Sequence, residues 1–210
     1  MSPDPRAQRG NNGKRFRKFS KSSDKDNFVL TNILSQKPVK FCFIAFHKPS
    51  LAGTNIRSNH GNEYNYLTKF LIERVSWTVR DAEVRAGNKV CDIILSEQSM
   101  YPLSDLHDYF HKLKRGLGRY NTRVNWENVG NLTQSPHQDE TGTHLADIAA
   151  SAFHRAIEPK EHGMTDERFF NNIFRRVYRG HKNKPHGLKI WPNEAIEPAK
   201  RDGRLLFLER

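Results

Sequence analysis

An alanine-rich, strongly apolar stretch at 143–156, Thr-His-Leu-Ala-Asp-Ile-Ala-Ala-Ser-Ala-Phe-His-Arg-Ala, constrains the fold more than any other part of the chain. A helix with apolar residues over so much of its surface has to be packed against other elements, yet it carries Asp147. A second carboxylate, Glu97, directly follows the apolar run 90–96, which is typical of a buried strand. A buried helix and a strand end that each present a carboxylate could together hold a divalent metal ion.

The charge of the chain points to a polyanionic partner. Its 210 residues include 35 Lys and Arg against 23 Asp and Glu, which gives a formal net charge of +12. An excess of this size favours nucleic acid or an anionic surface as the partner over a basic surface that is merely solvated. The length suits one domain with a core of its own. We therefore expect DNA or RNA as the partner.

The sequence argues against membrane insertion and export. No apolar run reaches the about 18 residues that a transmembrane helix needs, and no apolar stretch follows the charged N-terminus as in a secretory signal. Cys42 and Cys91 each lie inside a strand-like run, where reduced, buried thiols are the ordinary state. We therefore expect a cytoplasmic protein with no membrane partner.

Residues 1–15 and 16–210 differ in composition. The first segment is polar and basic, with prolines and an Asn-Asn-Gly sequence, and predicts a disordered tail. The second predicts a single α/β domain, because apolar strands alternate with amphipathic helices. Strands are expected at 39–46, 88–95 and 122–127, helices at 26–34, 62–86, 103–113, 143–156 and 165–177, and an edge strand or docking segment at 205–208. So few strands mean either that polar sequence hides weak strands or that part of the sheet is missing.

Each carboxylate also has an interpretation without catalysis. An ionised Asp147 among apolar side chains needs a metal, a cation or several N–H donors, but an aspartate early in a helix also complements the helix dipole. Functional groups in α/β proteins gather at the carboxyl ends of strands, where Glu97 is expected, but an exposed loop glutamate fits the same position. The residues alone leave both alternatives open.

The ten histidines do not form a recognisable zinc motif. His107 and His111 are four apart on a predicted helix, but the glutamate of the zincin pattern His-Glu-x-x-His is absent between them. His144 precedes Asp147 by one helical turn, where it is a proton shuttle, a phosphate contact or a plain histidine at a loop end. The chain also lacks a phosphate-binding glycine loop and the Gly-x-Ser-x-Gly elbow of α/β hydrolases.

The stretch Thr143-His-Leu-Ala-Asp147-Ile-Ala-Ala-Ser-Ala resembles the Leu-Ala-Asp helix of the DUF3800 family. Further segments are similar to that family in order and spacing: Lys18-Phe-Ser-Lys21, the strand at 39–46 with the lysine at 48, Asn62-Glu-Tyr-Asn-Tyr-Leu67, and Ile93-Ile-Leu-Ser-Glu97 with the helix that follows. The resemblance extends from about residue 16 to residue 180, and the Leu-Ala-Asp helix is its most specific part.

The resemblance implies a ribonuclease-H-like fold, in which a mixed sheet is flanked by helices, and metal-dependent hydrolysis of phosphodiester bonds by a bacterial or phage protein. Glu97 and Asp147 would be catalytic residues and ligands of Mg²⁺ or Mn²⁺, with His144 as a third catalytic residue. Basic side chains would hold the phosphate backbone. The residues expected in that role are Lys18, Lys21, Lys48, Arg175, Arg176 and Arg179.

One departure from the family pattern leaves the activity open. The opening strand of the family carries Asp-Glu-Ser-Gly, whose first aspartate is the expected principal metal ligand, and no segment of this chain matches it. Glu97 and Asp147 then make only half of the expected ligand set. We therefore expect a domain that lacks its first strands at the N-terminal side. It is either a metal-dependent nuclease, a catalytically inactive nucleic-acid-binding protein, or a subunit that completes its sheet with a protein partner or in a homodimer.

Overall fold

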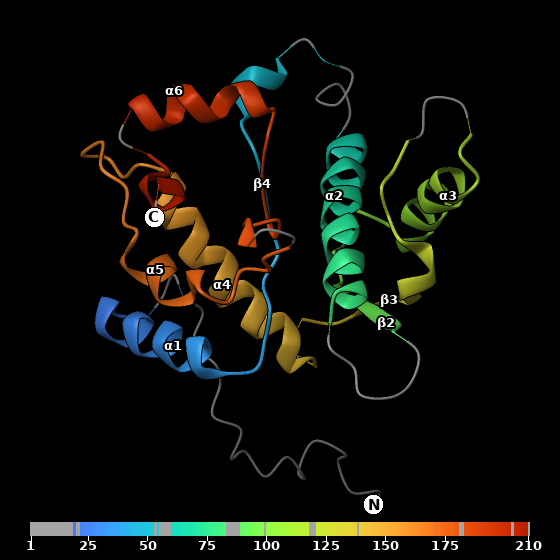
Figure 1. Cartoon of the computed structure of the whole chain (residues 1–210), viewed down its shortest axis with the longest axis horizontal. Coiled ribbons are helices and arrows are strands. Elements are labelled where there is room, and N and C mark those ends of the chain that lie inside the picture. The colour runs from blue at the N-terminus through green and yellow to red at the C-terminus, as the bar shows by residue number, and fades with distance from the viewer. Residues whose placement is uncertain are drawn as a thin grey trace, which may run out of the picture.

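The computed structural model describes residues 19, 22–52, 54, 60–82, 89–98, 100–117, 121–137, 139–180, 183–202 and 204–209. Within this part the chain is a mixed α/β protein in which helices pack around two small parallel sheets (Figure 1). No helix in the described ranges is long and apolar enough to cross a membrane. The expected disordered tail, residues 1–15, lies outside the described residues.

Helices make up most of the regular structure. The α-helices are α1 (Asp24–Gln36), α2 (His60–Arg80), α3 (Leu103–Lys114), α4 (Thr141–Ile157), α5 (Arg168–Phe174) and α6 (Ile196–Arg201). The strands are β1 (Phe43–Phe46), β2 (Cys91–Ser96), β3 (Val129–Ser135) and β4 (Leu188–Trp191). The short 3-10 helices are η2 (Lys48–Leu51), η3 (Trp126–Asn128), η5 (Asn193–Ala195) and η6 (Leu206–Glu209).

Both sheets consist of a parallel strand pair. β1 lies beside β4, with Phe43 opposite Leu188. β2 lies beside β3, with Ser96 opposite Ser135 at their carboxyl ends. Parallel strands need a crossover connection, and the segment that contains α3 supplies it between β2 and β3. Among the described residues, each of these strands has a single neighbouring strand.

Alternating side chains of β1 place different helices on its two faces. Phe43 packs against Phe153 of α4, with ring centroids 5.0 Å apart. The neighbouring Cys42 faces α2, where its sulfur lies 3.6 Å from the Thr78 hydroxyl oxygen. α4 and α2 therefore cover opposite faces of the β1–β4 sheet. Burial raises the pKa of the Cys42 thiol, and Cys42 and Cys91 are both free and half-buried.

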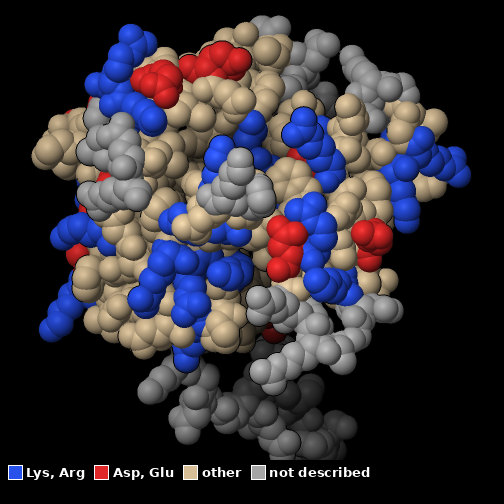
Figure 2. Space-filling view, viewed as in Figure 1, with Lys and Arg blue, Asp and Glu red and all other residues tan. Residues whose placement is uncertain are grey.

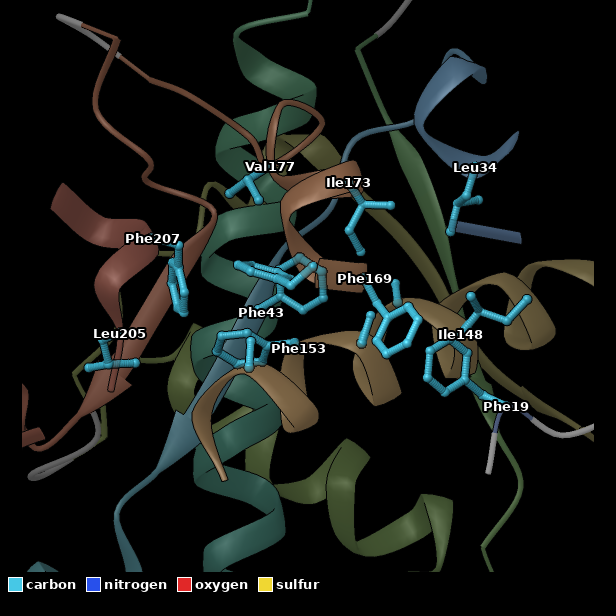
Figure 3. Close-up of a cluster of buried hydrophobic side chains, with 14 of the residues drawn as sticks. Phe19, Leu34, Phe43, Ile148, Phe153, Phe169, Ile173, Val177, Leu205 and Phe207 are labelled. Atoms are coloured by element: carbon cyan, nitrogen blue, oxygen red, sulfur yellow. The ribbon is translucent and has the colours of Figure 1, made fainter. Parts of the chain in front are cut away.

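The larger core cluster lies between α4, α5, α1 and the C-terminal residues, and phenylalanine rings dominate it (Figure 3). Ala152 and Ala156 of α4 are fully buried, because small side chains allow the neighbouring elements to approach the helix closely. Phe207 of η6 is also fully buried, with its ring centroid 4.8 Å from that of Phe170. Burial of such a side chain contributes roughly 1.5–3 kcal/mol, so the C-terminal segment is an integral part of the core.

A smaller core cluster joins α2 to α3 and to the β2–β3 sheet. Its buried members are Ile72, Leu106, Phe110, Leu113 and Val124. The three residues from α3 are spaced by three and four positions, as expected for one face of a helix. α3 ends before Gly116, whose φ of 62° is readily adopted by glycine. α2 thus packs on the β1–β4 sheet with one face and on this second cluster with another.

Most predicted helices are confirmed. The helices predicted at 26–34, 103–113 and 143–156 correspond to α1, α3 and α4, and the helix predicted at 62–86 corresponds to α2 but ends at Arg80. α1 begins where the Ser23 hydroxyl accepts a hydrogen bond from the Asp26 N–H at 3.1 Å, an N-cap worth about 1 kcal/mol. The helix expected after Thr165 is α5, but it begins only at Arg168.

The strand predicted at 122–127 is wrong. That segment is an irregular connection that leads into η3, and the strand is β3, which follows it. β3 escapes the sequence pattern because most of its side chains are polar, and β4 because it has only four residues. Polar sequence therefore does hide weak strands. The segment 205–208 docks onto the core as a 3-10 helix and is not an edge strand.

Candidate functional site

The carboxyl ends of β2 and β3 and the start of α4 lie together. The Glu97 N–H donates to the Ser135 carbonyl at 2.9 Å, which fixes the end of β2 against β3. The Ser96 hydroxyl oxygen lies 3.4 Å from Nδ1 of His137. The His137 ring packs edge-on against the ring of His144 in α4, with centroids 4.7 Å apart. The predicted catalytic residue His144 is thus connected to the strand end that carries Glu97.

The two predicted metal ligands have different surroundings. Glu97 is exposed, whereas Asp147 is half-buried in α4. α4 begins at Thr141, so Asp147 lies in its second turn, beyond the turn in which a carboxylate best complements the helix dipole. Among the described residues, no group of three or more His, Cys, Asp or Glu side chains could hold a metal ion. Glu97 and Asp147 do not make a complete Mg²⁺ or Mn²⁺ site by themselves, and their catalytic and metal-binding roles stay predictions.

The arginines after α5 that are predicted to contact phosphate also make contacts within the protein. Arg175 and Arg176 both donate to the Ser35 carbonyl, at 3.2 and 2.7 Å, and so fasten the end of α1 to this segment. The Arg179 guanidinium lies 5.3 Å from the ring centre of Phe174. A guanidinium has several N–H groups in a planar fork, so these arginines retain donors for a phosphate.

Lysine and arginine side chains outnumber aspartate and glutamate on the face of the molecule in Figure 2. Of the predicted lysine contacts, Lys48 is the first residue of η2 and is exposed. Lys18 and Lys21 lie outside the described residues. The contribution of these lysines to nucleic-acid binding stays a prediction.

Sequence reasoning missed a group of cations between α2 and β4, which we call the α2 cation cluster: Lys69, Arg74 and Lys189. Lys69 and Arg74 are each only 8% exposed, although they lie on a helix with solvent on part of its surface. All three side chains surround the ring of Phe70, from whose centre the Lys69 Nζ lies 5.3 Å and the Lys189 Nζ 5.7 Å. Such burial of lysine and arginine is uncommon without a counter-ion.

The buried carboxylate of Glu73, which is 5% exposed, lies beside this cluster, and the exposed carboxylate of Glu194 acts on Lys189. The Glu73 Oε2 lies 3.9 Å from Nη1 of Arg74. Its Oε1 accepts hydrogen bonds from the Arg123 N–H at 2.9 Å and the Thr122 hydroxyl at 3.2 Å. One carboxylate oxygen of Glu73 therefore faces the cluster, and the other is bound to the connection that leads to η3.

Burial dominates the acid–base properties of the cluster. It lowers the pKa of Lys69 below the usual value, although the neighbouring Glu73 opposes this effect. It also lowers the pKa of Lys189, to which the nearby Arg74 adds by repulsion. Both shifts show that the two ammonium groups are partly removed from water, although Glu73 and, for Lys189, Glu194 oppose the effect.

Aromatic rings form the walls around the cluster. Tyr66, Phe70, Trp77 and Trp191 are half-buried and belong to neither hydrophobic core cluster. The rings of Tyr66 and Phe70 meet edge to face with centroids 5.0 Å apart, and Tyr66 also contacts Trp191 at 5.8 Å. In the sequence, the only signal of this group is the recurrence of aromatic residues at 66, 70 and 77 with cations between them, which resembles an ordinary solvated helix face.

An apolar cavity of about 900 Å³ separates the two sheets. Its lining includes residues from β1, β2, α2 and α4, among them Ile44, Leu95, Leu67, Leu71, Ala146 and Ala150. α2 and α4 cover opposite faces of β1. The cavity therefore lies beside β1, in the same layer as the β1–β4 sheet and between the two helices. Free strand edges and an apolar lining are what an additional strand would require.

Comparison with known proteins adds no support for the resemblance to the DUF3800 family, which stays an expectation from the sequence. No protein-family model, no curated protein and no solved structure matches this chain.

Proposed function

We propose that this chain binds nucleic acid through the phosphate backbone. The observation that carries the proposal is the distribution of charge, with a net charge of +12 and an excess of Lys and Arg over the face in Figure 2. Contacts between such side chains and phosphates supply most of the sequence-independent affinity of proteins for DNA and RNA. We assign phosphate contacts to Arg175, Arg176 and Arg179, which follow α5, because a guanidinium has several N–H donors.

Fluorescence anisotropy with labelled single- and double-stranded DNA and RNA tests the proposal. We expect binding at low ionic strength, and weaker binding for Arg175→Gln, since Arg175 is exposed. Lys112→Gln, which removes an exposed charge from α3, is the control for net charge and is expected to bind more tightly than Arg175→Gln. The proposal fails if none of the four nucleic acids binds at low ionic strength.

A more specific proposal is that the protein also hydrolyses the bound nucleic acid, with a ribonuclease-H-like arrangement of its catalytic residues. It is supported by the resemblance and by the way the end of β2 meets the start of α4 near His144. In that form Asp147 and Glu97 would be two of the metal ligands. Cleavage that requires Mg²⁺ or Mn²⁺ and disappears in Asp147→Ala would support it, whereas equal cleavage by the variant would exclude Asp147 from catalysis.

A second candidate function is that of a partner-binding subunit. The specific observation is the apolar cavity, which lies next to strands that each have a single neighbour among the described residues. A strand from a second copy of this chain or from another protein could pair with β1 there and bury apolar side chains against α2 and α4. Light scattering tests the homodimer: a mass above 24.4 kDa that falls to the monomer value in Leu71→Arg supports it. A monomer at high concentration argues against self-association.

A further inference from the structure

The α2 cation cluster contains one buried donor, the Nε of Arg74, that no acceptor among the described residues satisfies. The Arg74 Nη1 donates to the Phe70 carbonyl at 3.0 Å, but its buried Nε has no hydrogen-bond partner in the part of the chain that the structure describes. The contacts of the Lys69 ammonium within the described part of the chain are with aromatic rings, 5.0 Å from the centre of Tyr66 and 5.3 Å from that of Phe70. An unsatisfied buried donor costs about 1–3 kcal/mol, and more when it is charged.

The neighbouring groups do not remove this cost. A cation over an aromatic face gains about 0.5–1 kcal/mol at exposed sites and roughly 2 kcal/mol when it is desolvated, but the ring accepts no conventional hydrogen bond. Glu73 and, near Lys189, the exposed Glu194 supply two negative charges against three cations among the described residues, and Glu73 is bound to the Arg123 N–H as well. Lys189 donates to the Asn193 Oδ1 at 2.6 Å, which orients its ammonium group but adds no negative charge. The cluster therefore has a net positive charge in a place of restricted solvation.

We propose that Lys69, Arg74 and Lys189 form a binding site for a phosphate group, and that this group belongs to a nucleic-acid strand. A phosphate has several oxygen acceptors and matches both the planar fork of an arginine and the point charges of lysines. The negative charge of the phosphate neutralises the excess positive charge of the cluster. The identity of the phosphate as part of a nucleic acid rests on the proposed function, whereas the site itself rests on the geometry of the cluster.

Two readouts separate this role from a purely structural one. The first is the thermal unfolding temperature at constant ionic strength in chloride and in inorganic phosphate, since a ligand of the folded state raises this temperature. The second is the affinity for a labelled single-stranded oligonucleotide. Lys69→Met removes the buried charge but keeps a long apolar side chain, Lys69→Arg keeps the charge, and Lys112→Met removes a charge from an exposed position of α3.

We expect phosphate to raise the unfolding temperature of the unmodified chain and of Lys112→Met but not that of Lys69→Met. Lys69→Met should bind the oligonucleotide at least about tenfold more weakly than Lys112→Met, as expected for the loss of one charge-assisted hydrogen bond. Lys69→Arg should retain most of the affinity. In chloride, Lys69→Met should unfold at the same or a higher temperature, because replacing an uncompensated buried charge with an apolar side chain is often stabilising.

Other outcomes separate the two proposals. If Lys69→Met is destabilised but responds to phosphate and binds the oligonucleotide like the unmodified chain, the cluster is structural and the inference is overturned, while nucleic-acid binding stands. If phosphate raises the unfolding temperature but no nucleic acid binds, the phosphate site stands and the proposed function fails. If phosphate and chloride give equal unfolding temperatures, there is no phosphate site.

Discussion

Lys69 and Lys189 come from α2 and β4, yet both hold their ammonium groups over the same Phe70 ring, 5.3 and 5.7 Å from its centre. Burial lowers the pKa of both ammonium groups, and repulsion by Arg74 lowers that of Lys189 further. The carboxylates of the buried Glu73 and, near Lys189, of the exposed Glu194 oppose this effect. An anion bound beside these side chains would offset the cost of removing their charges from water, and this is the basis of the phosphate site that we propose.

Glu73→Gln is expected to lower stability and to strengthen nucleic-acid binding. The amide can still accept hydrogen bonds from the Arg123 N–H and the Thr122 hydroxyl, but it leaves Arg74 and Lys69 without a counter-charge. Breaking a buried ion pair in this way costs about 3–5 kcal/mol. Urea unfolding measures the first effect and anisotropy titration the second.

The two variants Glu73→Gln and Lys69→Met should thus change stability and affinity in opposite directions. If both variants lose affinity together with stability, the cluster only supports the fold. Asp105→Asn at the exposed start of α3 serves as the control for loss of a negative charge, and we expect little change in stability.

Asp166 is expected to make stability sensitive to acid. The Arg168 guanidinium donates to both of its carboxylate oxygens at 2.9 Å, and this interaction holds the pKa of Asp166 below the usual 3.8. A lowered pKa contributes stability that is fully present above 3.8 and is lost as the pH falls through the lower value of the folded state. Asp166→Asn should therefore cost about 1–3 kcal/mol at neutral pH and much less in strong acid.

Urea unfolding of the unmodified chain and of Asp166→Asn at neutral and at strongly acidic pH checks this prediction. Asp24→Asn is a useful comparison, because Asp24 also pairs with Arg168 but is exposed. It should cost less than about 1 kcal/mol at any pH. Asp166→Asn and the unmodified chain should differ less in their free energy of unfolding in acid than at neutral pH. An equal difference at both pH values contradicts the stabilising role given to the ionised Asp166.

Phe207→Ala is expected to destabilise the fold by about 3–5 kcal/mol, although residue 207 lies near the C-terminus. Its ring is fully buried and contacts Phe170 and Phe174, with centroids 4.8 and 5.8 Å away. Chemical denaturation measures the loss. Phe28→Ala, at a residue that is 48% exposed, is the control and should change stability by less than about 0.5 kcal/mol. A similar small effect for Phe207→Ala would mean that η6 does not belong to the cooperative core.

Elements with strong periodicity or apolar content can be predicted from this sequence. α4 is recognisable because 143–156 is rich in alanine and other apolar residues, and the structure buries Ile148, Ala152 and Phe153. α3 is recognisable from apolar residues at intervals of three and four. β3 is not, because the sequence Val129-Gly-Asn-Leu-Thr-Gln-Ser135 is stabilised by pairing with β2 and by the packing of only a few apolar side chains.

The candidate sites were predictable to different degrees. Proximity of the β2 end and the start of α4 follows from the topology, which brings His144 next to His137. The α2 cation cluster does not follow from any local pattern, since Lys189 reaches it only because β4 pairs with β1 next to α2. Burial of Lys69 depends on this tertiary arrangement, whereas a lysine on a helix is ordinarily solvated.

Removal of divalent cations with EDTA is expected to leave nucleic-acid affinity unchanged. Binding is assigned to Lys and Arg side chains, and the described residues contain no group of three or more His, Cys, Asp or Glu that could hold a metal ion. Anisotropy titrations with EDTA and with Mg²⁺ at matched ionic strength test this point. If affinity is lost in EDTA and restored by Mg²⁺, the nucleic acid instead binds through a metal centre at Glu97 and Asp147.

The salt dependence of nucleic-acid binding tests whether Lys69 contacts a phosphate of the bound nucleic acid. The logarithm of the binding constant for a single-stranded oligonucleotide should fall linearly with the logarithm of the salt concentration, because bound lysines and arginines release counter-ions from the phosphates. Lys69→Met should reduce the magnitude of this slope by about 0.7–1, the value expected for one lost phosphate contact, and Lys112→Met should leave the slope unchanged. The account is contradicted if the chain binds no nucleic acid at low salt, or if Lys69→Met and the unmodified chain have the same slope and the same affinity.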